Sequence, residues 1–190
     1  AAEGTRLARA SVLVYRKEGM LCTLKHFPGR GKAPTDPHQE ISDITAERDV
    51  LEQEDLAPFR NLINEFDIQP PLIMVSHLRY PAYDAENPAC VSEVLLKGVL
   101  RKQLGFEGLV VTDDLEMGAM TSLYSFHDMG VMAVAAGADA LLVCPNAESQ
   151  KQVYAGILEA VQEGRLPADR LDEAVRRVLR TKLSLPPMQE

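Results

Sequence analysis

The sequence predicts an α/β fold, namely half of a (β/α)8 TIM-type barrel with four parallel βα units followed by closing helices. Short apolar runs alternate with segments of helical periodicity, which is typical of a parallel sheet covered on both faces. The 190 residues, 46% of them hydrophobic, suffice for one core but fall short of the roughly 250 residues of a whole barrel. We therefore expect a single domain spanning residues 1–190.

Four apolar runs are the predicted strands, at residues 21–24, 72–75, 108–112 and 138–144. The predicted helices occupy residues 5–18, 56–66, 92–104, 126–136, 149–163 and 168–182. Three of these helices end beside a glycine, a residue favoured at helix C-termini: Gly19, Gly105 and Gly137. This order of elements predicts strands that are joined by helices and that run in the same direction.

Polar residues follow every predicted strand. They are the pairs Lys25 and His26, Ser76 and His77, and Asp113 and Asp114, and the fourth strand is followed by Pro145 and the polar Asn146. Four parallel strands could also form a small doubly wound sheet. Functional residues that gather after several different strands are typical of a barrel, so this distribution favours half of a barrel.

Net charge and cysteine content limit the kinds of partner and ligand that the chain is expected to bind. The formal net charge of −8 disfavours nucleic acid and anionic membranes as partners and suits a neutral or modestly charged small substrate. The three cysteines, Cys22, Cys90 and Cys144, are widely spaced, so we expect core residues rather than disulfides or metal ligands. We also expect no cofactor, no membrane span and no signal peptide, and hence a cytoplasmic protein.

Asp113 and Asp114 end a predicted buried strand. Successive side chains of an extended chain point in opposite directions, so one acid is expected to face a site while the other caps the following turn. Two alternatives remain at this point. Both acids could be ordinary helix caps, or they could bind a metal with His26 and His77, although no metal-ligand spacing is evident.

The stretch from Leu21 to His38 carries four further candidates. A carboxylate two residues from an imidazole, as in Asp36 and His38, can fix the tautomer of that imidazole, although a solvated turn is the plainer interpretation. Lys25 and His26 could bind a substrate, or they could be an exposed lysine and a satisfied histidine at a strand end. Outside this stretch, His77 could likewise bind a substrate or be a satisfied histidine at a strand end.

His127 differs from the other histidines. It opens a predicted helix away from any strand end. We expect a surface or packing residue there rather than a member of the site.

Five motifs, taken in order, resemble those of one enzyme family. They are KHFPGRG, the D-x-H pair, MVSHLRYPAYD, LRKQLGFEGLVVTDDLEMGAM and AGADALLVCPN. Together they resemble glycoside hydrolase family 3, in particular its bacterial β-N-acetylglucosaminidases. The resemblance extends over nearly the whole chain, and the KHFPG and TDDLxM blocks are its most specific parts.

The resemblance implies catalytic roles. Asp113 matches the nucleophile of the family, and Asp114 is not expected to react. His38, paired with Asp36, matches the general acid/base of the N-acetylglucosaminidase branch. An imidazole titrates near neutral pH, so it can serve both as acid and as base without a large pKa shift.

The resemblance also implies a substrate. Lys25 and His26, on a strand expected from Leu21 to Phe27, match residues that bind hydroxyl groups of the terminal sugar, and His77 is expected to join them. The implied reaction removes terminal N-acetylglucosamine from cell-wall (peptidoglycan) or chitin-derived fragments with retention of configuration. The alternatives are a non-catalytic remnant that binds sugars or partner proteins, and a family 3 glycosidase for another sugar.

The chain departs from the family pattern at two residues and in its extent. Arg30 replaces the second histidine of the usual KHFPGHG, and Pro37 stands where the D-x-H pair usually has serine or threonine. The resemblance implies that the chain is the C-terminal half of the (β/α)8 TIM-type barrel, because the four front βα units of the family barrel are not in this sequence. We therefore expect an N-terminal half-barrel chain, or a second copy of this chain, as partner.

Overall fold

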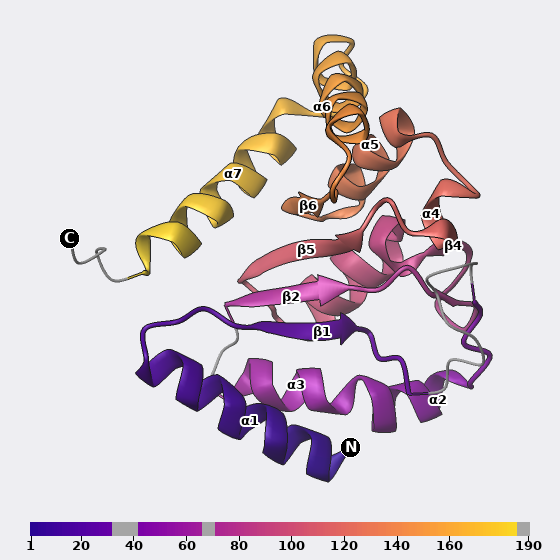
Figure 1. Cartoon of the computed structure of the whole chain (residues 1–190). Coiled ribbons are helices and arrows are strands. Elements are labelled where there is room, and N and C mark those ends of the chain that lie inside the picture. Colours follow the sequence, from indigo (N-terminus) through magenta and orange to yellow (C-terminus); the bar gives the residue numbers. More distant parts are fainter. Residues whose placement is uncertain (32–41, 66–70, 186–190) are drawn as a thin grey trace.

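The computed structural model describes residues 1–31, 42–65 and 71–185. Its main sheet has four parallel strands in the order β1-β2-β5-β6 (Figure 1). The strands are β1 (Thr23–Phe27), β2 (Leu72–Val75), β5 (Leu109–Asp114) and β6 (Ala140–Leu142). Adjacent strands follow one another in chain order and in the same direction, so the predicted half-barrel arrangement of βα units is confirmed.

Helical segments connect the strands, and two long helices close the chain. The long segments are α1 (Ala2–Lys17), α3 (Ala57–Asn64), the π-helical η3 (Val94–Gln103), α5 (Phe126–Ala136), α6 (Ala147–Gln162) and α7 (Ala168–Leu183). Short elements that were not predicted are α2 (Arg48–Val50), η1 (Leu51–Asp55), the hairpin strands β3 (Arg79–Tyr80) and β4 (Asp84–Pro88), η2 (Ala89–Val91) and α4 (Gly118–Thr121). In the part of the chain described here, no helix is long and apolar enough to cross a membrane.

The first strand begins later than predicted. The apolar run starts at Leu21, whereas β1 starts at Thr23 and extends through Lys25 and His26 to Phe27, the expected end of the strand. The Lys25 side chain is exposed in this strand, so the charge does not interrupt it. The last strand is shorter than predicted, and Cys144 beyond it is exposed rather than part of the core.

The two faces of the sheet differ. Ile73 and Val110, paired across β2 and β5, belong to the core that the helices form on one face. The next row, Lys25, Met74 and Val111, is exposed or half-buried on the other face. The prediction of a sheet covered on both faces is therefore wrong for the described residues, because their helices pack against one face only.

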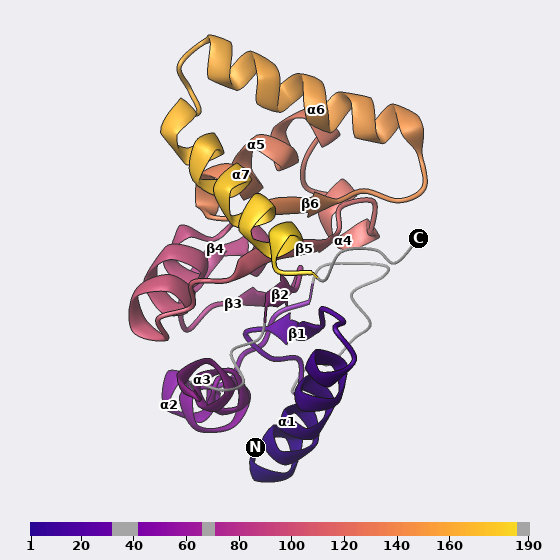
Figure 2. The ribbon, with the colours of Figure 1, turned by 90° about the vertical axis from the view of Figure 1, so that its left-hand side faces the viewer.

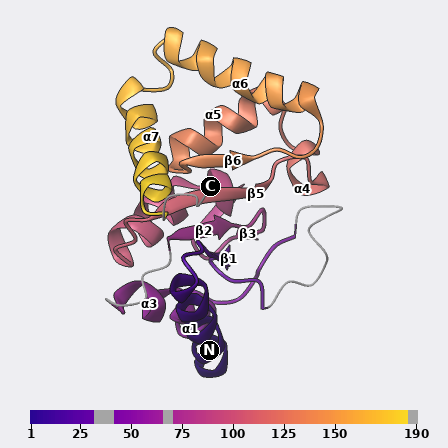
Figure 3. The same ribbon diagram turned by 60° about the vertical axis from the view of Figure 1, so that its left-hand side comes forward.

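The helices extend around both edges of the sheet. Figures 1 and 2 show α1 and α3 beyond β1, and α5 and α6 beyond β6. Val12 of α1 packs against Leu62 of α3 at the first edge. Figure 3 shows α6 and α1 at opposite ends of the sheet and α7 across the starts of β5 and β6.

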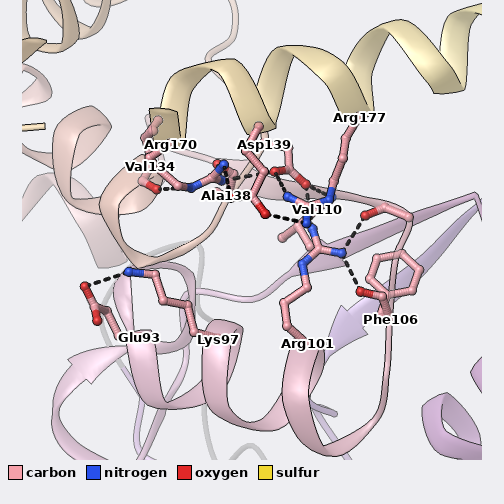
Figure 4. Close-up of polar contacts among 12 residues, drawn as sticks. Glu93, Lys97, Arg101, Phe106, Val110, Val134, Ala138, Asp139, Arg170 and Arg177 are labelled. Atoms are coloured by element: carbon pink, nitrogen blue, oxygen red, sulfur yellow. Dashed lines mark hydrogen bonds and ion pairs between the residues drawn. The ribbon is translucent and has the colours of Figure 1, made fainter. Parts of the chain in front are cut away.

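A buried carboxylate attaches α7 to the sheet (Figure 4). The Asp139 side chain is fully buried just before β6, and one of its oxygens accepts from the Val110 backbone N–H at 3.0 Å. Its oxygens also pair with Arg101 at 2.6 Å, Arg170 at 3.0 Å and Arg177 at 3.1 Å. These contacts link η3, the sheet and α7 at the end of the strands opposite Asp113.

Candidate active site

A β-bulge and a difference in strand length bring His26 to Asp113. Lys25 pairs with Met74 and Phe27 with Val75, so His26 is an extra residue on β1. Such bulges redirect side chains locally. Strand β2 ends at Val75, whereas β5 continues to Asp113 and Asp114. His26 Nε2 thus lies 3.3 Å from Asp113 Oδ2 at the carboxyl end of the sheet.

The two adjacent acids have different partners. Asp113 is largely buried, with 17% of its side chain exposed, and its Oδ1 accepts from the backbone N–H of Asp114 at 3.0 Å. The Oδ1 of Asp114 instead accepts from the backbone N–H groups of Glu116 at 3.1 Å and Cys144 at 3.2 Å. As the alternation of side chains predicts, Asp113 faces His26, while Asp114 caps the loop after β5.

The surroundings of His26 favour its neutral form with the proton on Nε2. Arg30 Nη1 lies 3.5 Å from His26 Nδ1, and a guanidinium can only donate, so Nδ1 is the acceptor. Nε2 then carries the proton that faces the Asp113 carboxylate. Burial lowers the pKa of His26, and the nearby cations of Arg30 and Lys25 lower it further, against the opposing effect of Asp113.

His77 lies behind the site rather than in it. The residue is only 1% exposed, directly after β2. Its Nε2 donates to the backbone carbonyl of Asp114 at 2.8 Å, and its Nδ1 lies 3.1 Å from Cys90 Sγ. Because protein atoms occupy both ring nitrogens, His77 does not present a nitrogen to a sugar, contrary to the expected role in substrate binding. Burial lowers its pKa.

A cavity of about 340 Å³ adjoins the site between α1, β1 and the η1–α3 segment. Lys25, His26 and Arg30 contribute its polar groups from β1 and the following loop. Leu24, Phe59 and Leu62 line it on the apolar side. A pocket with an apolar wall and a few convergent polar groups is the usual form of a small-molecule site.

The loop after β1 is fixed at its start. The Tyr80 hydroxyl donates to the backbone carbonyl of Gly29, and Asp55 Oδ1 accepts from the Gly31 N–H at 3.3 Å. Gly29 has a φ of +138°, and a Cβ there would lie 2.5 Å from Asp55 Cβ, so only glycine fits. Neither Tyr80 nor Asp55 had been predicted, because no local spacing links them to this loop.

The remaining predicted residues have different outcomes. Asp36 and His38 lie outside the described residues, so the acid/base pair stays a prediction. His127 is on the surface, as expected, with its Nε2 2.9 Å from Glu159 Oε2 on α6. Across residues 1–31, 42–65 and 71–185, no group of three or more His, Cys, Asp or Glu side chains is placed to hold a metal ion.

The fold and the site place this chain in a class. A parallel α/β sheet whose functional side chains meet at the carboxyl ends of different strands is typical of barrel-type enzymes. The family model "Glycosyl hydrolase family 3 N terminal domain" matches residues 2–181. The chain therefore belongs to glycoside hydrolase family 3.

Relatives agree with this assignment. A β-hexosaminidase from Idiomarina loihiensis is 35% identical over 160 residues, which cover 84% of this chain and 47% of the relative. β-Hexosaminidase A from Pseudoalteromonas piscicida is 29% identical, covering 96% of this chain and 33% of its own length. This chain thus spans half or less of these two relatives.

A solved structure extends the similarity to three dimensions. The family 3 β-N-acetylglucosaminidase from Paenibacillus sp. str. FPU-7 superposes with a TM-score of 0.91 at 36% identity. The match covers 95% of this chain and 34% of that structure. The sheet, the helices and their order thus follow those of a β-N-acetylglucosaminidase over almost the entire chain.

Proposed function

We propose that this chain supplies the nucleophile and sugar-binding residues of a retaining β-N-acetylglucosaminidase acting on cell-wall (peptidoglycan) or chitin-derived fragments. The observation that carries the proposal is the Asp113 carboxylate, whose two oxygens face the Asp114 N–H and the His26 ring. This arrangement orients a carboxylate at the carboxyl edge of the sheet. The names of the similar proteins, β-hexosaminidase and β-N-acetylglucosaminidase, support the sugar class.

The proposed reaction has two displacements. An Asp113 oxygen attacks the anomeric carbon, the bond from that carbon to the aglycone oxygen breaks, and His38 gives its proton to the leaving oxygen. Neutral His38 then takes a proton from water, which attacks the anomeric carbon and releases Asp113. Asp36 would orient His38 throughout. Two inversions give net retention of configuration.

Three residues have supporting roles in the proposal. Lys25 is exposed on the uncovered face of the sheet and can donate to sugar hydroxyls. His26, like Lys25, borders the cavity between α1, β1 and the η1–α3 segment. Its Nε2 proton points toward Asp113, where it can be shared with a hydroxyl of the bound sugar. His77 positions the Asp114 backbone instead of binding the sugar.

A partner that completes the barrel is part of the proposal. Apolar side chains are exposed on α1, such as Val14 at 61%, and in a stripe on α7 formed by Val175 at 47%, Leu179 at 51% and Leu183 at 83%. Together with the uncovered sheet face, they suit an N-terminal half-barrel or a second copy of the chain.

Three free thiols favour a reducing compartment, so we place the reaction in the cytoplasm, in the recycling of peptidoglycan.

Hydrolysis of an aryl β-N-acetylglucosaminide tests the proposal. The chain is assayed alone and together with the N-terminal half of a family barrel. Each sample is tested on this substrate and on the corresponding aryl glucoside. We expect release from the N-acetylglucosaminide, and loss of roughly a thousandfold or more in kcat for Asp113→Asn because covalent catalysis is removed. Asp114→Asn is the matched control, since its amide oxygen can still accept the two backbone N–H groups.

Two outcomes contradict the proposal. One is a completed barrel that hydrolyses neither substrate. The other is an Asp113→Asn variant with the same rate as the Asp114→Asn control. Preference for the glucoside would keep Asp113 as nucleophile but overturn the sugar assignment.

A further inference from the structure

Cys90 is placed to hold His77 in one protonation state. His77 Nε2 lies 2.8 Å from the Asp114 carbonyl, and a carbonyl only accepts, so Nε2 carries a proton. In the neutral ring, Nδ1 is then an acceptor. Cys90 Sγ lies 3.1 Å from Nδ1. The thiol therefore donates its proton to Nδ1, and each ring nitrogen has one complementary partner.

The chemistry of Cys90 supports this direction of donation. Cys90 is fully buried, and burial raises the pKa of its thiol, so the proton stays on sulfur. Its other sulfur contact is Met120 Sδ at 3.5 Å. A thiol has one proton, and an imidazole nitrogen is a stronger acceptor than a thioether, so the proton is directed to His77.

The groups that face His77 do not favour a charged ring. Burial lowers its pKa most, and Arg30 acts in the same direction. The carboxylates of Asp113 and Asp114 and the Asp114 carbonyl oppose this effect without reversing it. A thiol that donates to Nδ1 stabilises the neutral ring further, because protonation of Nδ1 would break that hydrogen bond.

The link from His77 to Asp113 passes through the backbone of Asp114. His77 holds the Asp114 carbonyl, and the N–H of the same residue donates to Asp113 Oδ1 at 3.0 Å. The Asp114 side chain is fixed separately by Glu116 and Cys144 N–H groups. A change in the orientation of the His77 ring would therefore move the donor that orients the Asp113 carboxylate.

We infer that Cys90 is a positioning residue for the reaction, acting through His77 and the Asp114 backbone to orient the Asp113 carboxylate. This inference rests on the proposed function, because it takes Asp113 as the nucleophile. Cys90 and His77 do not contact the substrate in this arrangement. They keep the nucleophile in one geometry, and binding of the sugar itself does not depend on them.

The test compares Cys90→Ala, which removes the donor, with Cys90→Ser, which keeps a one-proton donor. Cys22→Ala, a change at a half-buried cysteine away from His77, is the matched control. In the completed barrel we expect Cys90→Ala to lower kcat about fivefold with KM unchanged, the equivalent of one hydrogen bond of about 1 kcal/mol at 1.36 kcal/mol per tenfold in rate. Cys90→Ser and Cys22→Ala should keep the kcat of the parent.

Nitrogen-15 NMR of the histidine side chains in the 190-residue chain supplies a readout that does not depend on activity. In Cys90→Ala we expect the His77 Nδ1 resonance to move toward that of an unbonded nitrogen, the pKa of His77 to rise, and the Asp114 amide resonance to shift. Cys90→Ser should restore all three. A purely structural role for Cys90 would lower thermal stability without this pattern.

The outcomes separate the two proposals. Cys90→Ala with parental His77 and Asp114 resonances, or with parental kcat, overturns the positioning role. If the completed barrel of the parent hydrolyses no glycoside, the proposed function fails. The NMR comparison of the His77 and Asp114 resonances then still decides whether Cys90 governs His77 and, through it, the Asp114 backbone.

Discussion

His26 Nε2 lies 3.3 Å from Asp113 Oδ2, although strand β2 separates the strands that carry the two residues. The contact is possible because β2 ends at Val75 while β5 continues beyond the residue paired with Val75, Thr112. The bulge that makes His26 the extra residue of β1 supplies the other half of the contact. The ends of the strands, rather than a dedicated loop, thus assemble the described part of the site.

Arg30 should set the pH range over which His26 stays neutral. In Arg30→Gln, the loss of a cation near His26 Nδ1 should raise the pKa of His26, because a nearby positive charge disfavours the imidazolium. The acid limb of the pH dependence of kcat/KM in the completed barrel should therefore move to higher pH. The pKa can be measured directly by NMR titration of the His26 ring.

Arg6→Gln on the exposed surface of α1 is the control for a general loss of charge. It should leave the His26 titration and the pH profile where they are in the parent. If Arg30→Gln lowers the pKa of His26 or leaves it unchanged, the electrostatic account of this pair is wrong.

His38→Ala should separate substrates by leaving group. The aryl oxide of an aryl N-acetylglucosaminide departs as a stabilised anion and needs little protonation, whereas the sugar that leaves from a natural disaccharide requires a proton on its oxygen. The rate of glycosyl-enzyme formation should therefore fall by roughly a hundredfold or more on the disaccharide and much less on the activated aryl glycoside. Single-turnover kinetics on both substrates measure the difference, and equal losses would argue against the acid role.

The fold could be predicted from the sequence because apolar runs and helical periodicity are local patterns. The apolar run at 72–75 coincides with β2, and the helix at 126–136 coincides with α5. The start of β1 was missed by two residues, because the apolar run begins at Leu21 and the strand at Thr23. The apolar run alone also stops at residue 24, although β1 includes Lys25. Among the described residues the Lys25 side chain is exposed, so this charge belongs to the strand at no cost in burial.

The site could be predicted only where chemistry follows strand ends. Asp113 and His26 fit that rule, and they do meet. The contact of His77 with Cys90 depends on the hairpin that follows β2, and no sequence spacing announces it. The hydrogen bond from His77 to the Asp114 carbonyl also depends on tertiary packing. The position of His77 after a strand does not predict whether its ring is exposed or buried.

Acid should destabilise the fold through its buried histidine. The pKa of His77 is lowered in the folded state, so below its ordinary value of 6.5 the unfolded chain binds more protons than the folded chain. Stability from this residue is complete above that pH and is lost as pH falls toward the folded pKa. Urea denaturation at about pH 7 and about pH 5 measures the loss.

Carboxylates contribute to the same trend, so His77→Gln isolates the part that belongs to the histidine. Its Nε2 can still donate toward the Asp114 carbonyl without titrating. We expect a smaller fall in the free energy of unfolding between the two pH values for this variant. A fall as large as that of the parent would mean that His77 does not titrate differently in the folded and unfolded states.

Asp139→Asn should be the most damaging substitution away from the site. The variant leaves three arginines, whose side chains are 10–15% exposed, without their shared anion. Removing one partner from a buried ion pair costs about 3–5 kcal/mol. Urea denaturation followed by circular dichroism should show a loss of that size in the free energy of unfolding. Glu148→Gln, at an exposed pair on α6, should change it little.

The loss of stability in Asp139→Asn should be concentrated where α7 meets the sheet, because Asp139 links this helix through Arg170 and Arg177 to the start of β6. Hydrogen exchange should therefore increase first in α7 and in the residues around Val110, whose N–H loses a charged acceptor. The His26–Asp113 contact lies at the opposite ends of the strands and should keep its NMR signature. Uniform exchange across the chain would instead show that Asp139 stabilises the whole fold cooperatively, rather than the attachment of α7.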